Sequence, residues 1–299
     1  MKLTKKILIG AFACLLMGIF TGCNNSEKTF TIAYAPNEST ENGDDARNGL
    51  AKDLSAVLGM KVQEIQASDY NAIVEALRTG KADLAYMGAL SVAMSMERAK
   101  ATPIVMKATN GDKSQAIYHS VFITKSDNSS INSIKDLKGK SIAFVDPNST
   151  SGNLVPTSEI MTAFPELKLD SDKIHTNGVF FRAVSFSGKH QAGLQAVIKG
   201  DIDVVPISDQ ILVSEIANGN APKDSVKIIH SSAAIPAEGM VVSSKVDAAT
   251  KAKLVKFLIS YDNPSYFSLV IKNPKARFVE CSAADYEPIV ELNRNINAD

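Results

Sequence analysis

The sequence is poor in cysteine and has no excess of charge of either sign. Its 299 residues include three cysteines and equal numbers, 32 each, of basic and acidic side chains. Cys14 lies in an N-terminal apolar segment that we expect to be removed, and Cys23 directly follows that segment, so Cys281 is the one thiol left for other roles. A single thiol can form neither an internal disulfide nor a zinc site. No basic patch is interleaved with aromatic residues, which argues against nucleic acid as a partner.

The first 22 residues have the layout of a secretory signal. Three lysines precede the apolar core Ile7–Phe20, which is too short to span a bilayer comfortably. The sequence Thr21-Gly22-Cys23 resembles the lipobox of bacterial lipoproteins, in which small residues precede a cysteine that becomes acylated. We therefore expect residues 1–22 to be a signal peptide, Cys23 to carry lipid and residues 23–28 to form a polar tether. The protein would then lie outside the cytoplasm, anchored to the cell membrane; an ordinary secretory signal cleaved elsewhere is the alternative.

The remaining 277 of the 299 residues alternate between segments of strand and helix character. Such a length can bury a large core and favours two lobes over one. The alternation runs from Thr29 to a strand at Tyr118–Thr124, which predicts an α/β lobe with a largely parallel sheet. It resumes after the polar stretch Ser126–Asn132 and includes a further strand at Val179–Phe186. Met240–Ser243 and the helix that follows would return the chain to the first lobe.

The predicted fold is therefore α/β, with two lobes joined by a hinge of two crossing segments. Residues 29–122 and 240–299 would form lobe I, and residues 123–239 would form lobe II. An internal similarity supports two related lobes: Glu75–Met87 and Gln195–Ile207 both predict a helix, a glycine C-cap, a turn with aspartate and a buried strand. A cleft between such lobes is a usual place for a small ligand.

A run of hydroxyl residues stands where a strand is followed by a helix. Ser141–Val145 predicts a buried strand, Leu154–Phe164 predicts a helix, and Ser149-Thr150-Ser151-Gly152 lies between them. The first N–H groups of a helix have no partner inside the helix, so an oxyanion placed there would receive N–H and O–H donors and favourable interaction with the helix dipole. The alternative is an ordinary N-cap, which one hydroxyl would satisfy. Consecutive hydroxyls exceed that need and favour anion binding.

Six segments, taken together, carry a resemblance to a known family. They are Asn37-Glu38-Ser39-Thr40, Ala67-Ser68-Asp69-Tyr70, Ala82-Asp83-Leu84-Ala85-Tyr86-Met87-Gly88, Tyr118-His119-Ser120, Asp146-Pro147-Asn148-Ser149-Thr150-Ser151-Gly152-Asn153-Leu154-Val155-Pro156 and Ile235-Pro236. The chain resembles the substrate-binding lipoproteins of ABC importers for phosphate, phosphite and phosphonate, the PhnD-like family. The resemblance covers nearly all of the mature chain. It implies a type II periplasmic-binding fold that closes around an anion and delivers it to a membrane permease with its ATPase.

The resemblance also implies which residues contact the anion. The oxyanion contacts of the family fall on Ser149 and Thr150, with Ser151 continuing the turn. His190, which precedes a predicted helix of the second lobe, would donate to the anion, more strongly if its imidazole is protonated. Two tyrosines that close the pocket from the first lobe fall on Tyr70 and Tyr118. Without the resemblance, His190 would be read as a helix-capping or surface histidine and both tyrosines as core residues.

The nature of the ligand beyond its oxyanion is left open. Relatives that bind aminoalkylphosphonates hold the ammonium with carboxylates, and Glu238 falls at one such position. The second acid falls on Gln210, whose neighbour Asp209 could replace it after a slip of one residue. Met87 stands where close relatives carry an aromatic side chain. Phosphate, phosphite and phosphonates therefore all remain possible ligands, and Glu238 is either a reader of a ligand tail or a solvated carboxylate at the rim.

Two other classes of function are weighed against an importer component. Ser149 with His190 could suggest a phosphoester hydrolase, but the sequence has no nucleophile elbow and no orienting acid that can be named. A lipoprotein sensor or adhesin could use the same fold, because fold alone does not decide function. We expect a monomeric protein that is not an enzyme and that uses no cofactor or metal.

Overall fold

The computed structural model describes residues 29–36 and 43–297, and the structural statements below concern these residues. The predicted signal peptide, the tether with Cys23 and the segment Asn37-Glu38-Ser39-Thr40 lie outside them. Within the described ranges, no helix combines the length and the apolar character needed to cross a bilayer.

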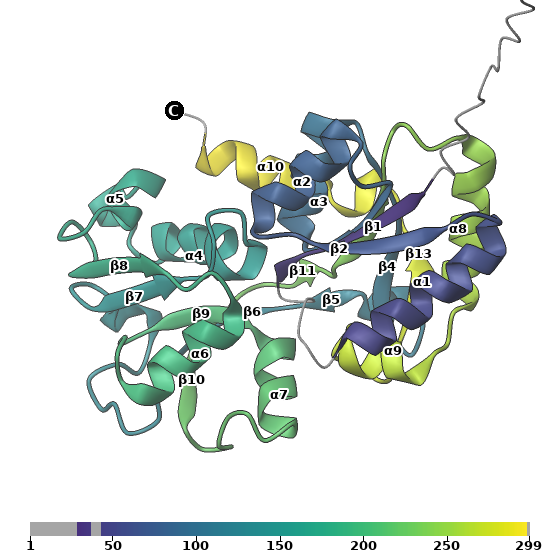
Figure 1. Ribbon diagram of the computed structural model, residues 1–299. Helices are drawn as coiled ribbons and strands as arrows, with labels where there is room; N and C mark the ends of the chain where they lie inside the picture. Colours follow the sequence, from purple (N-terminus) through teal and green to yellow (C-terminus); the bar gives the residue numbers. More distant parts are fainter. Residues whose placement is uncertain (1–28, 37–42, 298–299) are drawn as a thin grey trace, which may run out of the picture.

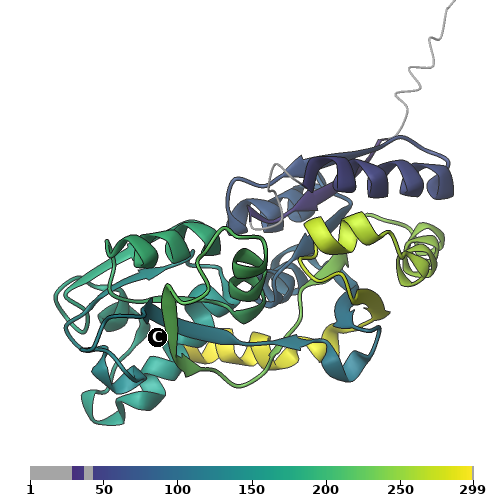
Figure 2. The same cartoon turned by 90° about the horizontal axis from the view of Figure 1, so that it is seen from below.

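The chain folds into two α/β lobes that lie side by side (Figures 1 and 2). The first lobe is built on a six-stranded sheet in the order β13-β4-β12-β3-β1-β2. Its strands are β1 (Phe30–Tyr34), β2 (Val62–Gln66), β3 (Leu84–Met87), β4 (Thr102–Thr109), β12 (Gly239–Val242) and β13 (Ala276–Glu280). Its helices are α1 (Asp44–Leu58), α2 (Tyr70–Thr79), α3 (Ala89–Ala99), α8 (Ala248–Ser260), α9 (Pro264–Leu269) and α10 (Glu287–Ile296).

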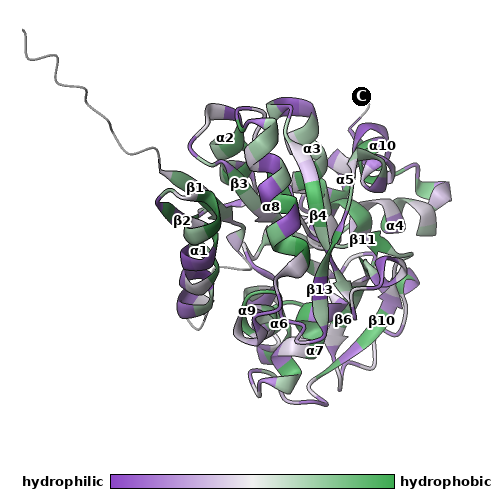
Figure 3. Ribbon diagram, turned by 90° about the vertical axis from the view of Figure 1, so that its right-hand side faces the viewer, coloured by the Kyte–Doolittle hydropathy of each residue, from purple (hydrophilic) through white to green (hydrophobic). Residues whose placement is uncertain are grey.

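Helices cover both faces of this sheet and enclose two apolar cores. Side chains of α2, α3 and α10 pack in one buried cluster, and side chains of α1, α8 and α9 pack in another. Figure 3 shows the strands β1 and β4 as largely apolar, whereas the outer helix α1 carries polar stretches. β1 and β3 are buried along their whole length because both of their sides face helices.

The predicted parallel arrangement of the first lobe is confirmed for β1–β4, which all run in one direction, but not for the later strands β12 and β13. β1 runs parallel to β2 and β3, but β12 is antiparallel to both β3 and β4, and β13 is antiparallel to β4. The cause is the route of the chain. Parallel neighbours need a crossover connection, usually a helix, whereas β12 arrives directly from the other lobe and enters the sheet from its opposite end. The alternation of strands and helices in the sequence does not reveal that direction.

The second lobe has a mixed sheet. β6 (Ser120–Lys125) pairs antiparallel with both β9 (Val205–Ser208) and β10 (Val226–Ser231). β7 (Ser141–Phe144) pairs parallel with β8 (Ala183–Phe186). A single β-bridge between Ile142 and Val204, the residue before β9, connects this pair to the other three strands. The predicted strand Val179–Phe186 begins only at Ala183, because the preceding residues form a turn in which the Gly178 N–H donates to the Phe181 carbonyl. The helices of this lobe are α4 (Val155–Ala163), α5 (Ser171–His175), α6 (His190–Lys199) and α7 (Asp209–Ala217).

Two short strands form the hinge between the lobes. β5 (Ile117–Tyr118) pairs antiparallel with β11 (Ile235–Pro236). The single strand predicted at Tyr118–Thr124 is therefore interrupted at His119, since β5 belongs to the hinge and β6 to the second lobe. The predicted lobe limits, 29–122 with 240–299 and 123–239, remain predictions; β6 runs across the first limit and β12 across the second.

The repeated unit predicted from the sequence is present in both lobes. α2 ends at Gly80 and α6 ends at Gly200, and both glycines are left-handed, with φ of 79° and 82°. The aspartate three residues after each glycine accepts a hydrogen bond from a backbone N–H of a neighbouring strand. Asp83 Oδ2 lies 2.8 Å from the nitrogen of Thr31, and Asp203 Oδ2 lies 2.8 Å from that of Ser141. In the first lobe this carboxylate thus links the residue before β3 to β1, and in the second lobe it links the turn before β9 to the start of β7.

Candidate anion-binding site

The hydroxyl turn after β7 begins with a wide helical turn. Residues Thr150–Leu154 form a π-helix that continues into α4, so the helical segment starts four residues before the predicted Leu154. Ser149 is the N-cap: its side chain accepts the N–H of Gly152 at 3.1 Å, and its carbonyl accepts the N–H of Leu154 at 3.0 Å. Single π turns of this kind are frequent at functional sites.

Pro156 and Gly152 explain why the turn adopts this shape. Proline has no N–H, so Pro156 cannot bond to the carbonyl of Gly152 four residues earlier, and that carbonyl instead accepts the N–H of Val145 at 3.0 Å. The turn thereby folds back onto the end of β7. A Cβ atom at Gly152 would lie 2.4 Å from the Cβ of Val145, so the close approach requires glycine.

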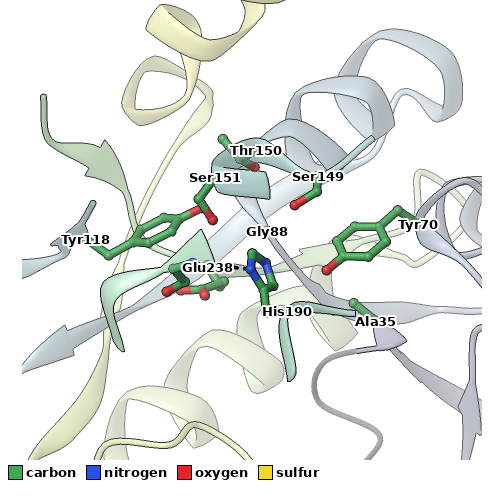
Figure 4. A pocket seen from close by; sticks show the side chains of 10 residues that line it. Ala35, Tyr70, Gly88, Tyr118, Ser149, Thr150, Ser151, His190 and Glu238 are labelled. Atoms are coloured by element: carbon green, nitrogen blue, oxygen red, sulfur yellow. Dashed lines mark hydrogen bonds between the residues drawn. The ribbon is translucent and has the colours of Figure 1, made fainter. Parts of the chain in front are cut away.

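A polar pocket lies between the lobes at this turn (Figure 4). Its lining includes seven of the nine residues predicted to bind the ligand. In Figure 4, the hydroxyl groups of Ser149 and Tyr70 point toward the ring of His190. The described residues that line the pocket are Ala35, Tyr70, Gly88, Tyr118, Ser149, Thr150, Ser151, His190, Ser208 and Glu238.

Five helix N-termini converge on the pocket. Tyr70 and His190 are the first residues of α2 and α6, and Gly88, Ser149 and Ser208 are the N-caps of α3, the π-helix and α7. The N-caps of α3, α6 and α7 form no side-chain capping bond. Because each N-terminus carries partial positive charge and N–H groups without intrahelical partners, the pocket favours an anion.

Groups from both lobes meet at the pocket. The N–H of Leu90, in the first turn of α3, donates to the Thr150 Oγ1 at 2.8 Å. Tyr70 belongs to α2 of the first lobe, yet its buried side chain packs in an apolar cluster with Val121 and Val145 of the second lobe. The hydroxyl turn is thus held against the first lobe, and the pocket is formed by both lobes together.

His190 is a neutral hydrogen-bond donor. It is buried, and burial lowers the pKa of its imidazole from 6.5 to about 3. Its Nδ1 accepts the backbone N–H of Ser208 at 3.2 Å, which leaves the proton on Nε2. Protonation of Nδ1 would oppose that bond. The structure therefore favours donation to an anion from a neutral Nε2–H, and not the charge-assisted donation considered from the sequence.

Tyr118 is also held in its neutral form. Burial raises the pKa of its hydroxyl, and the negative charge of Glu238 raises it further, whereas hydrogen bonding with Ser151 and Thr150 acts in the opposite direction. A neutral phenol keeps its proton and can donate it to a ligand. Tyr118 thus contributes a donor next to the hydroxyl turn.

Glu238 is neither solvated nor at the rim. It is buried in the pocket wall, and its Oε2 lies 2.7 Å from the Nζ of Lys107, which is buried as well. Their backbones also meet, since the Lys107 N–H donates to the Glu238 carbonyl at 3.0 Å. Among the described residues that line the pocket, Glu238 is the one acid, and the resident ammonium of Lys107 offsets its charge.

The structure does not bring Asp209 and Gln210 into the pocket lining. Asp209 Oδ2 lies 3.2 Å from the Nδ1 of His119, and the Gln210 side chain donates to the carbonyl of Ile117 at 3.1 Å. Both residues border a separate groove between α7 and the first lobe. Their predicted ligand role has no support from this geometry.

Ala35, Gly88 and Ser208 line the pocket but were not predicted, and Ser208 is the one of these three with a polar side chain. Its side chain is 1% exposed, and its Oγ has no hydrogen-bond partner within the described part of the chain. Ser208 ends β9 and caps α7, so it stands at a strand-to-helix turn as Ser149 does. That pattern was available in the sequence, although a single serine there is also an ordinary N-cap.

Two α/β lobes, two hinge strands and a polar pocket between the lobes define a type II periplasmic-binding protein. Residues 32–286 match the family described as "ABC transporter, phosphonate, periplasmic substrate-binding protein". The chain belongs to this family, whose members are substrate-binding transport proteins.

Curated relatives carry names that refer to three kinds of phosphorus oxyanion. The phosphate-import protein PhnD of Mycolicibacterium smegmatis is 32% identical over 209 residues, which cover 64% of this chain and 62% of that protein, less than two thirds of its length. The phosphonates-binding periplasmic protein of Escherichia coli is 28% identical over 79% of this chain and 67% of its own. A Prochlorococcus marinus protein named "Probable ABC transporter phosphite binding protein PhnD1" is 26% identical over 95% of both chains.

Solved structures share the fold. The binding component of an ABC phosphonate transporter from Pseudomonas aeruginosa superposes with a TM-score of 0.77 at 23% identity, covering 91% of this chain and 87% of that one. PhnD1 of Prochlorococcus marinus, solved with methylphosphonate, gives a TM-score of 0.76 at 22% identity, covering 90% of this chain and 98% of that one. These similarities confirm the predicted fold class.

Proposed function

We propose that this protein captures a phosphorus oxyanion, either a phosphonate, phosphite or phosphate, in the interlobe pocket and delivers it to the permease of an ABC importer. The convergence of five helix N-termini on one pocket is the observation that carries the proposal. The ligand oxygens would accept hydrogen bonds from the hydroxyls of Ser149, Thr150 and Ser151, from both tyrosines and from the Nε2 of His190. All of these donors are neutral, so the site binds charge through oriented dipoles.

Closure of the lobes follows from the same contacts. The Thr150 Oγ1 accepts the N–H of Leu90 across the lobes, so the position of this hydroxyl beside the ligand depends on contact between the lobes. A ligand that takes donors from both lobes would stabilise the closed arrangement relative to an open one. Recognition of the closed form by a permease would then couple ligand capture to delivery.

A lipid anchor would place the protein at that permease. Acylation of Cys23, proposed from the lipobox-like sequence, would hold the protein at the membrane surface, where one acyl chain binds marginally and two or more bind stably. The protein would act there as a monomer beside the permease and its ATPase.

Titration calorimetry on the mature chain tests the ligand assignment. The panel consists of phosphate, phosphite and methylphosphonate, with acetate as an anion of different shape. The double variant Ser149→Ala with Thr150→Ala should lose at least tenfold in affinity for the best ligand while it stays folded, because each hydrogen bond to charge contributes about 1.5–3 kcal/mol. Unchanged affinity would show that the anion binds elsewhere, and the absence of binding by every phosphorus oxyanion would refute the proposed function.

A further inference from the structure

Lys107 and Glu238 form a buried ion pair, of which Glu238 is the member that lines the pocket. Lys107 lies on β4 and is 6% exposed, and Glu238, just before β12, is 7% exposed. The two side chains are 2.7 Å apart, and their backbones are linked by the bond described above. The pair is therefore positioned by neighbouring segments of the sheet rather than by two flexible surface chains.

This pair changes what the Glu238 carboxylate can do for a ligand. A carboxylate without a counterion would repel a bound oxyanion but attract an ammonium on the ligand's substituent. With the Lys107 ammonium in place, a ligand ammonium would become a second cation beside one carboxylate, in a site that excludes water. Like charges brought together under these conditions are strongly disfavoured.

The small size of the cavity also disfavours a ligand with an aminoalkyl tail. Its volume is about 20 Å³, little more than the roughly 10–15 Å³ that a single water molecule needs by the same measure. A compact tetrahedral group suits such a cavity better than a group with an extended chain.

We propose that Lys107 determines the ligand class of this protein, by occupying Glu238 and excluding phosphonates with a cationic tail. The inference rests on the proposed function and narrows it. The site selects phosphorus oxyanions whose fourth substituent is small and uncharged, such as phosphate, phosphite or methylphosphonate. Glu238 then does not read a ligand ammonium in the native protein.

The native protein provides the first test. Methylphosphonate and 2-aminoethylphosphonate carry the same oxyanion and differ in the tail. Calorimetry should show at least tenfold tighter binding of methylphosphonate. Equal affinities, or tighter binding of 2-aminoethylphosphonate, would overturn the role of Lys107 but leave the proposed function intact. If neither these two ligands nor phosphate and phosphite bind, the proposed function itself fails.

Replacement of Lys107 provides the second test. Lys107→Ala removes the ammonium and opens space beside Glu238, so the ammonium of 2-aminoethylphosphonate can take its place. The ratio of affinities should shift at least tenfold toward 2-aminoethylphosphonate, even if the unpaired carboxylate weakens all anions. Lys113→Ala is the matched control, because Lys113 pairs with Asp285 outside the pocket lining, and its ratio should stay unchanged. An unchanged ratio in folded Lys107→Ala would contradict the proposal.

A double variant separates the charge from the space. Lys107→Ala with Glu238→Gln opens the same space without leaving a buried carboxylate unpaired, which also protects folding if the single variant is unstable. The proposal requires that the double variant shows no gain for 2-aminoethylphosphonate relative to methylphosphonate. A gain equal to that of the single variant would mean that space alone excludes the tail, and would overturn the assignment to the ion pair.

Discussion

The pH dependence of folding stability should report the buried neutral state of His190. Burial lowers the pKa of this imidazole from 6.5 to about 3, while the unfolded chain keeps the ordinary value. Between these values the unfolded state binds a proton and the folded state does not. The stabilisation is thus complete above pH 6.5 and is lost as the pH falls toward 3. At about 1.36 kcal/mol per unit, lowering the pH from 7.5 to 5 should cost about 2 kcal/mol through this residue.

Urea unfolding of the wild type and His190→Gln at pH 7.5 and pH 5 measures this contribution. Glutamine does not titrate, so the difference in unfolding free energy between the two proteins should change by about 2 kcal/mol over this range. The other histidines and all carboxylates are common to both proteins and cancel in the difference. A difference that is independent of pH would refute the neutral, buried assignment of His190. A change of opposite sign would mean that the folded state holds His190 as a cation.

Three further outcomes follow from the site. Gly152→Ala should cost about 1–3 kcal/mol of stability and abolish anion binding, because the new Cβ overlaps the side chain of Val145. Adding Val145→Ala should restore part of the stability, measured by unfolding, and part of the binding, measured by titration. Ser208→Ala should leave thermal stability unchanged or slightly higher, since the hydroxyl has no partner in the described structure, but should weaken ligand binding by about 1–3 kcal/mol; unaltered affinity would remove Ser208 from the ligand contacts. Cys23→Ser should eliminate metabolic labelling by a fatty-acid analogue and release the protein or leave its precursor unprocessed, whereas labelling that persists would place the acylation elsewhere.

Local sequence was sufficient for the hydroxyl turn and the repeated unit. The helix predicted in the unit Glu75–Met87 ends at Gly80 as expected, and Asp69 caps its start; both signals act within one turn of the helix. Ser149 and its neighbours form the expected strand-to-helix turn for the same reason. The family resemblance added His190 and the two tyrosines, which local pattern alone would have assigned to a cap and to the core.

Only the tertiary structure decided what surrounds these residues. Lys107 and Glu238 are 131 positions apart in the sequence, and neither has a local signal for the other. They meet because β12 returns from the second lobe and inserts beside β4 in an antiparallel direction. Gln210 likewise donates to the carbonyl of Ile117 on the hinge strand β5, 93 positions earlier in the chain. Hydrogen bonds within a helical turn follow from neighbouring residues, but the pairing of distant charges depends on strand order and direction, which the hydrophobic pattern of the sequence does not specify.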